Sequence, residues 1–419
     1  MGITLERRRL GASFWRLWCA TGISASGDGL VTVAIPLLAL TVTRNLVAIA
    51  GVTATNRTAA ALASLPAGMA ADRFDRRRLM LVCNLAAGTV LLGLVISMTS
   101  GVADLAVLYL TAGILAACDT TYALAMQASF PDIVHPDYLA VANSRLMAVD
   151  GAGAQFLGPG GGGMLFALAR RLPFVADAVS FFVSAWLIRG IVPRMVSGPA
   201  GNGGTGLGVT SGRDRYRWWP AFKQGLQQYR AKRPLLLLTS TVSSVSFCQG
   251  MVFALLVVYA RFTLHLSSGG YGLLLALAAA LGVAGAFSSS VLQRRFGAGR
   301  VITCGAAATA VSYCGMAFTR SAVLAVFMLG VQEVGVAVAN VGSVTTRQQL
   351  IPRELYGRVG SVHRLVVNLA VPLGALSGGL VASVSSVPTC ILVAGLCDSV
   401  ALVLLGPALL RRLAAAGVR

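Results

Sequence analysis

Long apolar runs of about 20 residues recur along the whole chain, and they constrain the fold more than any other feature. Each run is long enough to cross a hydrocarbon core of roughly 30 Å as an α-helix. Of the 419 residues, 56% are hydrophobic and only 11% are charged, whereas soluble domains carry roughly 25% charged residues. The sequence therefore predicts an all-α integral membrane protein.

Twelve such runs can be distinguished, and clusters of proline, glycine or arginine separate them. The first is too long for a signal-peptide core, so we predict a retained helix that follows a basic arm at residues 1–10. Phe14, Trp15 and Trp18 are predicted to form an interfacial aromatic belt at its foot. The twelve predicted helices cover residues 13–41, 47–71, 79–99, 104–129, 139–168, 172–193, 235–262, 270–292, 300–319, 322–346, 358–384 and 388–410.

The formal charge of +20 would suggest nucleic-acid binding in a soluble protein, so the location of the charge matters. With twelve spans, all but six of the 34 lysines and arginines fall on one side of the membrane. This asymmetry is the positive-inside rule, and it predicts that both termini are cytoplasmic. Nucleic acid is therefore not needed as a partner. The six exceptions are Arg57, within a span, and Arg44, Arg170, Arg171, Arg261 and Arg320.

A polar segment at residues 194–233 divides the twelve helices into two halves, 1–193 and 234–419. Its first part, residues 197–208, has the composition of a flexible linker. The rest is basic and aromatic, which favours a helix on the membrane surface over a partner-binding site. Its aromatic and apolar residues recur at helical spacing: Trp218, Phe222, Leu226 and Tyr229.

Three short patterns recur in the same order in the two halves, offset by about 220 residues, which predicts a pair of parallel repeats. The segment 127–132 is echoed by 348–353, and the cluster at 68–78 has a weaker counterpart at 294–300. A third echo pairs the glycine strings at 158–163 and 374–379. Two parallel repeats are the arrangement expected of a secondary transporter in which two helical bundles rock against each other.

The densest charged cluster lies between the second and third predicted helices. Five of its residues fit the pattern G-x-L-A-D-R-x-G-R-R: Gly68, Asp72, Arg73, Arg76 and Arg77. This pattern is the loop signature of the major facilitator superfamily, which the chain resembles over nearly its whole length. The chain departs from the signature at Ala70, where leucine is usual, and at Asp75, where a second glycine is usual.

Within that superfamily, the Gly27-Asp28-Gly29 segment and the charged cluster resemble the branch that includes enterobactin exporters and macrolide-efflux proteins. Gly158, Pro159, Gly162 and Gly163 resemble the G-P-x-x-G-G antiporter signature, which is associated with export. Ala154 departs from it, because that signature usually has a further glycine there. From the residues alone, these glycines serve static packing or sliding of helices equally well.

For the charged cluster, the arginines are expected to hold the loop in the cytoplasm. The resemblance implies that Asp72 faces the N-terminal end of helix 11, and a contact made only when the cytoplasmic side is closed would bias the carrier toward its outward-open state. The alternative is that the cluster only sets the topology. An unchanged transport rate and conformer population in Asp72→Asn would exclude gating.

Ionisable residues within spans are candidates for proton coupling or for the substrate cavity. At a rise of roughly 1.5 Å per residue, four of them fall at a similar depth: Asp28, Arg57, Asp119 and Glu333. Asp28 and Arg57 could instead form a structural ion pair. Asp150 lies somewhat lower, and structural roles are expected for Asp177 and Asp398.

No enzymatic chemistry, cofactor or metal site is expected. The sequence has no phosphate-binding G-x-x-x-x-G-K-[ST] motif. The eight cysteines lie singly in apolar runs, which disfavours zinc and disulfides. His135, His265 and His363 are predicted as surface residues.

The leading functional hypothesis is a monomeric, multi-pass transporter of a bacterial cytoplasmic membrane. It would export a lipophilic small molecule, such as an antibiotic, a siderophore or another secondary metabolite, in exchange for protons. The alternatives are a transporter-like sensor or partner protein without net export, and an importer of the same superfamily.

Overall fold

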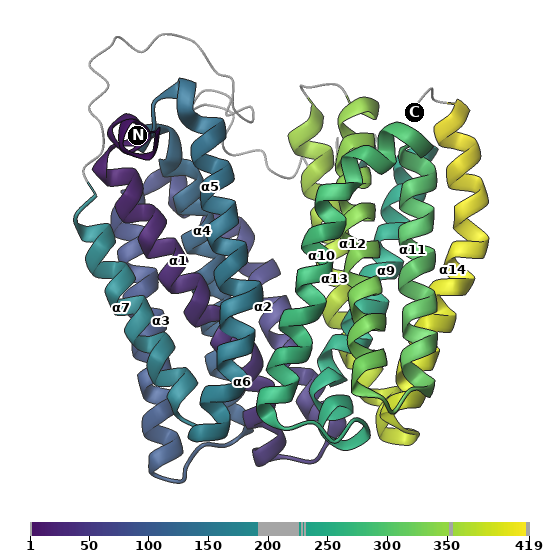
Figure 1. Cartoon of the computed structure of the whole chain (residues 1–419), viewed down its shortest axis with the longest axis horizontal. Helices are drawn as coiled ribbons and strands as arrows, with labels where there is room; N and C mark the ends of the chain where they lie inside the picture. The colour runs from purple at the N-terminus through teal and green to yellow at the C-terminus, as the bar shows by residue number, and fades with distance from the viewer. Residues whose placement is uncertain (1, 192–225, 228, 230–231, 352–354, 416–419) are drawn as a thin grey trace. The chain divides into compact units, whose positions relative to one another are not determined.

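The computed structural model describes residues 2–191, 226–227, 229, 232–351 and 355–415, without the side chains of residues 2–9, 65, 72, 131, 136 and 356–358. Every regular element in this part of the chain is helical (Figure 1). The helices are α1 (Gly2–Val42), α2 (Leu46–Arg73), α3 (Arg76–Thr99), α4 (Leu105–Ile133), η1 (Pro136–Tyr138), α5 (Leu139–Gly151), η2 (Ala152–Leu157), α6 (Gly158–Leu168), α7 (Leu172–Arg189), α9 (Arg233–Val258), η3 (Tyr259–Thr263), α10 (Ser268–Phe296), α11 (Ala298–Phe318), α12 (Ala322–Leu350), α13 (Tyr356–Val384) and α14 (Val387–Ala415).

Eleven helices in the described part of the chain are long and apolar enough to cross a membrane. The remaining predicted span, residues 139–168, is a continuous helical stretch made of α5, η2 and α6. Its middle part, η2, is a π-helix, and it divides the stretch into pieces of 13, 6 and 11 residues. The predicted all-α membrane fold is therefore confirmed, and the fifth span contains an irregular turn of a kind that is frequent at functional sites.

Side-chain caps fix several helix starts. The Asp75 carboxylate accepts a hydrogen bond from the backbone N–H of Arg78, and Asp104 caps α4 in the same way. Because Asp75 acts as the N-cap, α3 begins at Arg76, three residues before the predicted start. Arg76, Arg77 and Arg78 are therefore part of a helix rather than of a loop, which corrects the expectation from the sequence.

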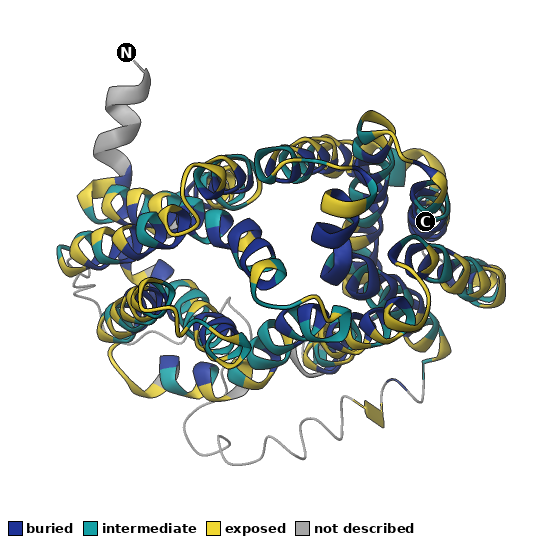
Figure 2. Ribbon diagram, turned by 90° about the horizontal axis from the view of Figure 1, so that it is seen from below, coloured by how far each residue is buried: buried dark blue, intermediate teal, exposed yellow. Residues whose placement is uncertain are grey.

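By their contacts, the residues form two compact units. The N unit comprises Met1–Ser197 and Val257–Leu277, and the C unit comprises Gly198–Leu256 and Ala278–Arg419. In each unit, buried residues lie mainly on helix sides that face other helices of that unit (Figure 2). The predicted division at 194–233 stays a prediction, and most of that segment lies outside the described residues. Residues 352 and 353 of the echo at 348–353 also lie outside them.

Glycines bring the α5–α6 stretch against α1 at backbone distance. A Cβ atom added at Gly158 would collide with the backbone of Gly29, and one added at Gly162 would collide with the backbone of Leu30. On another side of α6, a Cβ at Gly163 would collide with the backbone at the start of α10, at Ser268. The glycine string is thus packed on two sides, as small residues at this spacing allow between membrane helices.

The corresponding string in the C unit makes the same kind of contact. A Cβ at Gly374 of α13 would collide with the carbonyl O of Phe247 in α9, and one at Gly378 would lie 2.7 Å from that of Met251. In both units, therefore, two glycines four residues apart allow one helix to pack directly against the backbone of another. This equivalence supports the predicted internal repeat.

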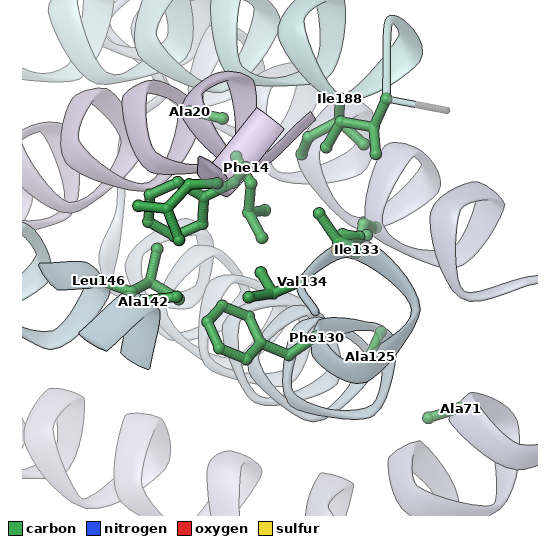
Figure 3. Packing of buried hydrophobic residues seen from close by; sticks show 14 residues of the cluster. Phe14, Ala20, Ala71, Ala125, Phe130, Ile133, Val134, Ala142, Leu146 and Ile188 are labelled. Carbon is green, nitrogen blue, oxygen red and sulfur yellow. The ribbon is translucent and has the colours of Figure 1, made fainter. Parts of the chain in front are cut away.

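A cluster of 14 buried apolar residues holds one end of the N unit together (Figure 3). Phe14 is at its centre, with no exposed surface, and packs edge-on against Phe130 of α4. The prediction that Phe14 belongs to an interfacial aromatic belt is therefore wrong. Trp18, one turn further, donates a hydrogen bond from Nε1 to the carbonyl O of Arg145 at 3.2 Å.

Tyr229 and His363 are also more deeply placed than predicted. Thr239 of α9 donates a hydrogen bond to the Tyr229 hydroxyl at 3.2 Å, and its Oγ1 lies 2.9 Å from Nδ1 of His363 in α13. Tyr229 is 2% exposed and His363 5%. The predictions of a membrane-surface position for Tyr229 and a surface position for His363 are therefore wrong, because both side chains are hydrogen-bonded within the C unit.

Candidate functional site

The N unit contains a cavity of about 580 Å³ between its helices. Five helices contribute to its wall. The lining residues are Thr21, Ser24, Ala25 and Asp28 of α1, Cys83 and Asn84 of α3, Cys118, Asp119, Tyr122, Ala123, Met126, Gln127 and Phe130 of α4, Asn143, Leu146, Met147 and Asp150 of α5, and Phe181 of α7. This volume is in the range of small-molecule binding sites.

Helical spacing explains how these side chains reach one cavity. The α1 residues 21, 24, 25 and 28 have the spacing i, i+3, i+4, i+7 of one helix face, and residues 119, 122, 123, 126, 127 and 130 of α4 continue the same pattern to i+8 and i+11. On α5, Asn143, Leu146, Met147 and Asp150 repeat the pattern. Each of these three helices therefore presents to the cavity one face that mixes polar and apolar residues, and this spacing is visible in the sequence.

The cavity is strongly acidic. Asp28, Asp119 and Asp150 line it together, and no lysine, arginine or histidine is among its lining residues. Asp28 lies within electrostatic range of the other two carboxylates and of Asp177. Carboxylates crowded into a low-dielectric site repel each other, so the site needs positive charge inside it, as protons or as a cationic ligand.

The glycines that flank Asp28 hold this part of α1 in place. A Cβ at Gly27 would collide with the Asp177 carboxylate of α7, and a Cβ at Gly29 would lie 2.7 Å from Cα of Gly158. Asp177 is 1% exposed and accepts a hydrogen bond from the Ser180 hydroxyl at 2.9 Å. Gly27 therefore packs against α7 and Gly29 against α6, while Asp28 between them lines the cavity.

The four predicted site residues are only partly brought together. Asp28 and Asp119 line the same cavity. Arg57 of α2 is exposed and is not among the lining residues, and no ion pair joins it to Asp28 in the described part of the chain. Glu333 belongs to the C unit, where its side chain packs against Gly282 of α10.

Two arginines of the charged cluster reach the C-terminal ends of neighbouring helices. Nη1 of Arg76 lies 2.7 Å from the carbonyl O of Ala128 and 2.6 Å from Oδ2 of Asp132, both in α4. Arg77 donates a hydrogen bond to the carbonyl O of Arg189, the last residue of α7. A guanidinium is favourable at a helix C-terminus, so the cluster ties α3 to both helices.

The other residues of the loop signature lie in α2. Gly68 has open space around its Cα, because an added Cβ would meet no atom within 4 Å. Arg73 is the last residue of α2 and is exposed. The side chain of Asp72 lies outside the described residues, so the structure does not test its predicted contact.

The structure also brings together residues that the sequence analysis did not connect. Cys83 of α3 and Cys118 of α4 both line the cavity as free thiols. Asn84, next to Cys83 in the cavity wall, donates a hydrogen bond from Nδ2 to the Ser184 hydroxyl of α7 at 2.9 Å. These pairs depend on how α3 packs against its neighbours, which the sequence pattern alone does not determine.

The family model of the Major Facilitator Superfamily matches residues 17–375 and, in a second match, residues 242–415. The chain therefore belongs to the Major Facilitator Superfamily. Together with the membrane helices and the cavity, this membership makes it a multi-pass secondary transporter and not an enzyme. A comparison with curated proteins gave no match.

Several solved structures share the fold. A bacterial homologue of the iron transporter ferroportin in an inward-facing state is 20% identical, with a TM-score of 0.70 over 94% of this chain and 98% of that one. A bacterial homologue of the human lysosomal transporter Spinster is 15% identical, with a TM-score of 0.71 over 96% and 97% of the two chains. The nucleoside transporter NupG is 13% identical, with a TM-score of 0.70 over 96% and 98%. At these identities the likeness shows the fold alone.

Proposed function

We propose that this transporter exports a lipophilic small molecule that carries a positive charge, in exchange for protons. The observation that carries the proposal is the acidic cavity of the N unit, where Asp28, Asp119 and Asp150 face no basic side chain among the lining residues. Apolar residues such as Phe130, Leu146 and Phe181 line the same cavity and would contact the hydrophobic part of the substrate. Among the substrate classes expected from the sequence, an antibiotic-like amine fits this lining better than an acidic siderophore.

Exchange follows from competition for the same carboxylates. A cationic substrate and protons both neutralise the cavity, so occupancy by one disfavours the other. Release of the substrate on one side of the membrane would then accompany proton uptake there. In this scheme Asp119 and Asp28 bind both ligands in turn, and Glu333 of the C unit is a further candidate for proton transfer.

Export, rather than import, is supported by the glycine string at Gly158 to Gly163, which resembles an antiporter signature and packs α6 against two neighbours. The alternatives remain an importer and a transporter-like partner protein without net transport.

We also propose that both termini are cytoplasmic and that the protein lies in the cytoplasmic membrane of a bacterium, because its lysines and arginines are concentrated on one side of the predicted topology. Reporter fusions at the two termini test this orientation.

Transport in proteoliposomes tests the proposed function. Protein reconstituted with an outward proton gradient, acidic inside, should accumulate the lipophilic cation ethidium, and collapse of the gradient by an ionophore should release it. Asp137→Asn, which changes an exposed carboxylate outside the cavity, serves as a matched control for Asp119→Asn. Equal accumulation in empty vesicles, or no effect of the ionophore, would contradict proton-driven transport.

The role of Asp72 as a gate also stays a proposal, which rests on the match to the loop signature. Asp72→Asn should change the transport rate together with the population of the conformers, as double electron–electron resonance between spin labels would detect. If neither quantity changes, Asp72 has no gating role.

A further inference from the structure

A second cavity, of about 500 Å³, lies between α10, α11 and α12 within the C unit, and we call it the C-unit groove. Apolar side chains line most of it, among them Leu281 and Phe296 of α10 and Phe327 of α12. These three side chains are 40%, 48% and 55% exposed, so the groove opens on the surface of the unit. All three helices are long and apolar enough to cross a membrane, and a groove on their surface is therefore accessible to lipid.

Glycines leave the space for this groove and fix its walls. A Cβ atom added at Gly305 of α11 would lie 2.5 Å from the carbonyl O of Gly335 in α12, and the reverse is also true. Gly330 of α12 is covered by the side chain of Leu281 of α10. All three glycines line the groove. The helices thus meet at backbone distance, and no side chain of these residues fills the space between them.

The length of the groove suits an acyl chain. Its lining residues on α10 extend from Leu281 to Phe296, roughly 22 Å at a rise of about 1.5 Å per residue. One leaflet contributes about half of a hydrocarbon core of roughly 30 Å. The groove is therefore long enough to hold the acyl chain of a lipid from a single leaflet and to reach its headgroup.

Positive charge is concentrated at one end of the groove, where α10 turns into α11 at Gly297. Arg294 and Arg295 belong to the last turn of α10, and Arg300 is the third residue of α11. Arg300 itself lines the groove, and the guanidinium of Arg295 lies over the ring of Phe296, 5.5 Å from its centroid. Within the described part of the chain, no ion pair joins these arginines to a carboxylate.

The sequence counterpart of this cluster in the N unit has a carboxylate partner. There, Arg76 forms an ion pair with Asp132, the last residue of the segment 127–132. The echo of that segment in the C unit, 348–353, ends in Arg353 instead. The repeat that supplies an acid in the N unit thus supplies a base in the C unit, which favours an anion from outside the chain at this end of the groove.

We propose that the C-unit groove binds one anionic phospholipid, with an acyl chain between α10 and α12 and the phosphate at Arg300. Basic residues at the end of a membrane span attract anionic headgroups, and a guanidinium matches the geometry of a phosphate. In the predicted topology this end of the groove lies at the cytoplasmic leaflet. The site is separate from the acidic cavity of the N unit and is independent of the substrate proposed above.

Competition between two lipids for the purified full chain tests the site. Native mass spectrometry should show tighter binding of phosphatidylglycerol than of phosphatidylcholine with the same acyl chains. Arg300→Gln should reduce this preference by about 5-fold, as expected for one arginine beside an anionic headgroup. Arg320→Gln, which removes an exposed arginine beyond the opposite end of α11, is the matched control and should keep the preference. Equal binding of the two lipids, or an equal loss in both variants, would overturn the proposal.

A second measurement uses only the wild-type protein and locates the lipid. Cys304 is an exposed free thiol that lines the groove, whereas Cys397 is an exposed free thiol of α14 outside it. Phosphatidylglycerol should slow the reaction of Cys304 with a maleimide reagent more than phosphatidylcholine does, without slowing that of Cys397. Glycerol 3-phosphate, which carries the phosphate without acyl chains, should not protect Cys304. Equal protection by the two lipids, no protection by either, or protection by glycerol 3-phosphate would contradict an anionic phospholipid in the groove.

Discussion

Nη1 of Arg76 lies 2.6 Å from Oδ2 of Asp132, and this ion pair joins the first turn of α3 to the last turn of α4. The same nitrogen also contacts the carbonyl O of Ala128 at 2.7 Å. If the charged cluster only set the membrane topology, the Arg76 side chain would be expected in solvent without a protein partner. In the structure it is part of the contact network at one end of the N unit.

Removing this tie should destabilise the N unit by an amount that depends on which partner is lost. Asp132→Asn removes only a partly exposed ion pair, which is worth about 0–1 kcal/mol. Arg76→Gln also removes the bond to the Ala128 carbonyl and should cost about 0.5–1.5 kcal/mol more. Thermal unfolding in detergent should therefore give a lower midpoint for Arg76→Gln than for Asp132→Asn, with the exposed Arg78→Gln near wild type. Equal midpoints for Arg76→Gln and Arg78→Gln would contradict this role.

The glycine contacts predict a difference between glycines of the same helical stretch. Gly158→Ala would force α1 and α6 apart and should cost about 1–3 kcal/mol, as overpacking does elsewhere. A Cβ at Gly151 would meet no atom within 4 Å, so Gly151→Ala should be neutral or stabilising. In the C unit, Gly374→Ala and Gly360→Ala form the equivalent pair. Unfolding midpoints of the four variants test the prediction. Similar midpoints within each pair would show that the helix contacts at Gly158 and Gly374 can accommodate a methyl group.

The buried network around Thr239 predicts a second stability difference. Thr239→Val leaves the Tyr229 hydroxyl and the His363 ring nitrogen without this partner, which should cost about 1–3 kcal/mol. Thr241 on the same helix is also buried but bonds only the carbonyl O of Leu237, one turn back. Thr241→Val should therefore cost less. If both valine variants unfold at the same temperature, the network does not stabilise the C unit.

Glu333 is the predicted site residue whose role is best tested by transport. If it transfers protons, Glu333→Gln should reduce proton-driven export by at least 10-fold while exchange of labelled for unlabelled substrate continues. Asp398→Asn is the comparison, since Asp398 is a buried carboxylate of the same unit for which a structural role was predicted. Full export by Glu333→Gln under a proton gradient would remove this residue from the proton pathway.

The helices and part of the cavity could be predicted from the sequence because both follow from local patterns. The length of an apolar run sets each span, and the depth of an ionisable residue along its helix placed Asp28 and Asp119 at one level. That depth estimate also placed Arg57 with them, although it is exposed on α2 and does not line the cavity. Depth alone cannot tell which side of a helix a residue occupies relative to its neighbours.

Features that depend on the packing of one helix on another were not predictable in this way. Cys83 and Cys118 lie 35 positions apart, and only the packing of α3 against α4 places both thiols in the wall of one cavity. Likewise, the arginines after Asp75 looked like a solvated loop, because their partners are backbone carbonyls of other helices. Phe14 was misplaced for the same reason, since an aromatic residue near a helix end packs inward as readily as it anchors to lipid.

If the carboxylates of the N-unit cavity select a positively charged substrate, as we propose, a matched pair of ligands of opposite charge will show it. Tetraphenylphosphonium and tetraphenylborate have nearly the same shape and opposite charge. Saturable binding to the purified protein should be at least 10-fold tighter for the cation, a difference of about 1.4 kcal/mol or more. Asp119→Asn should weaken cation binding while Asp137→Asn leaves it unchanged. Equal affinity for the two ions, or tighter binding of tetraphenylborate, would show that the cavity does not select cations.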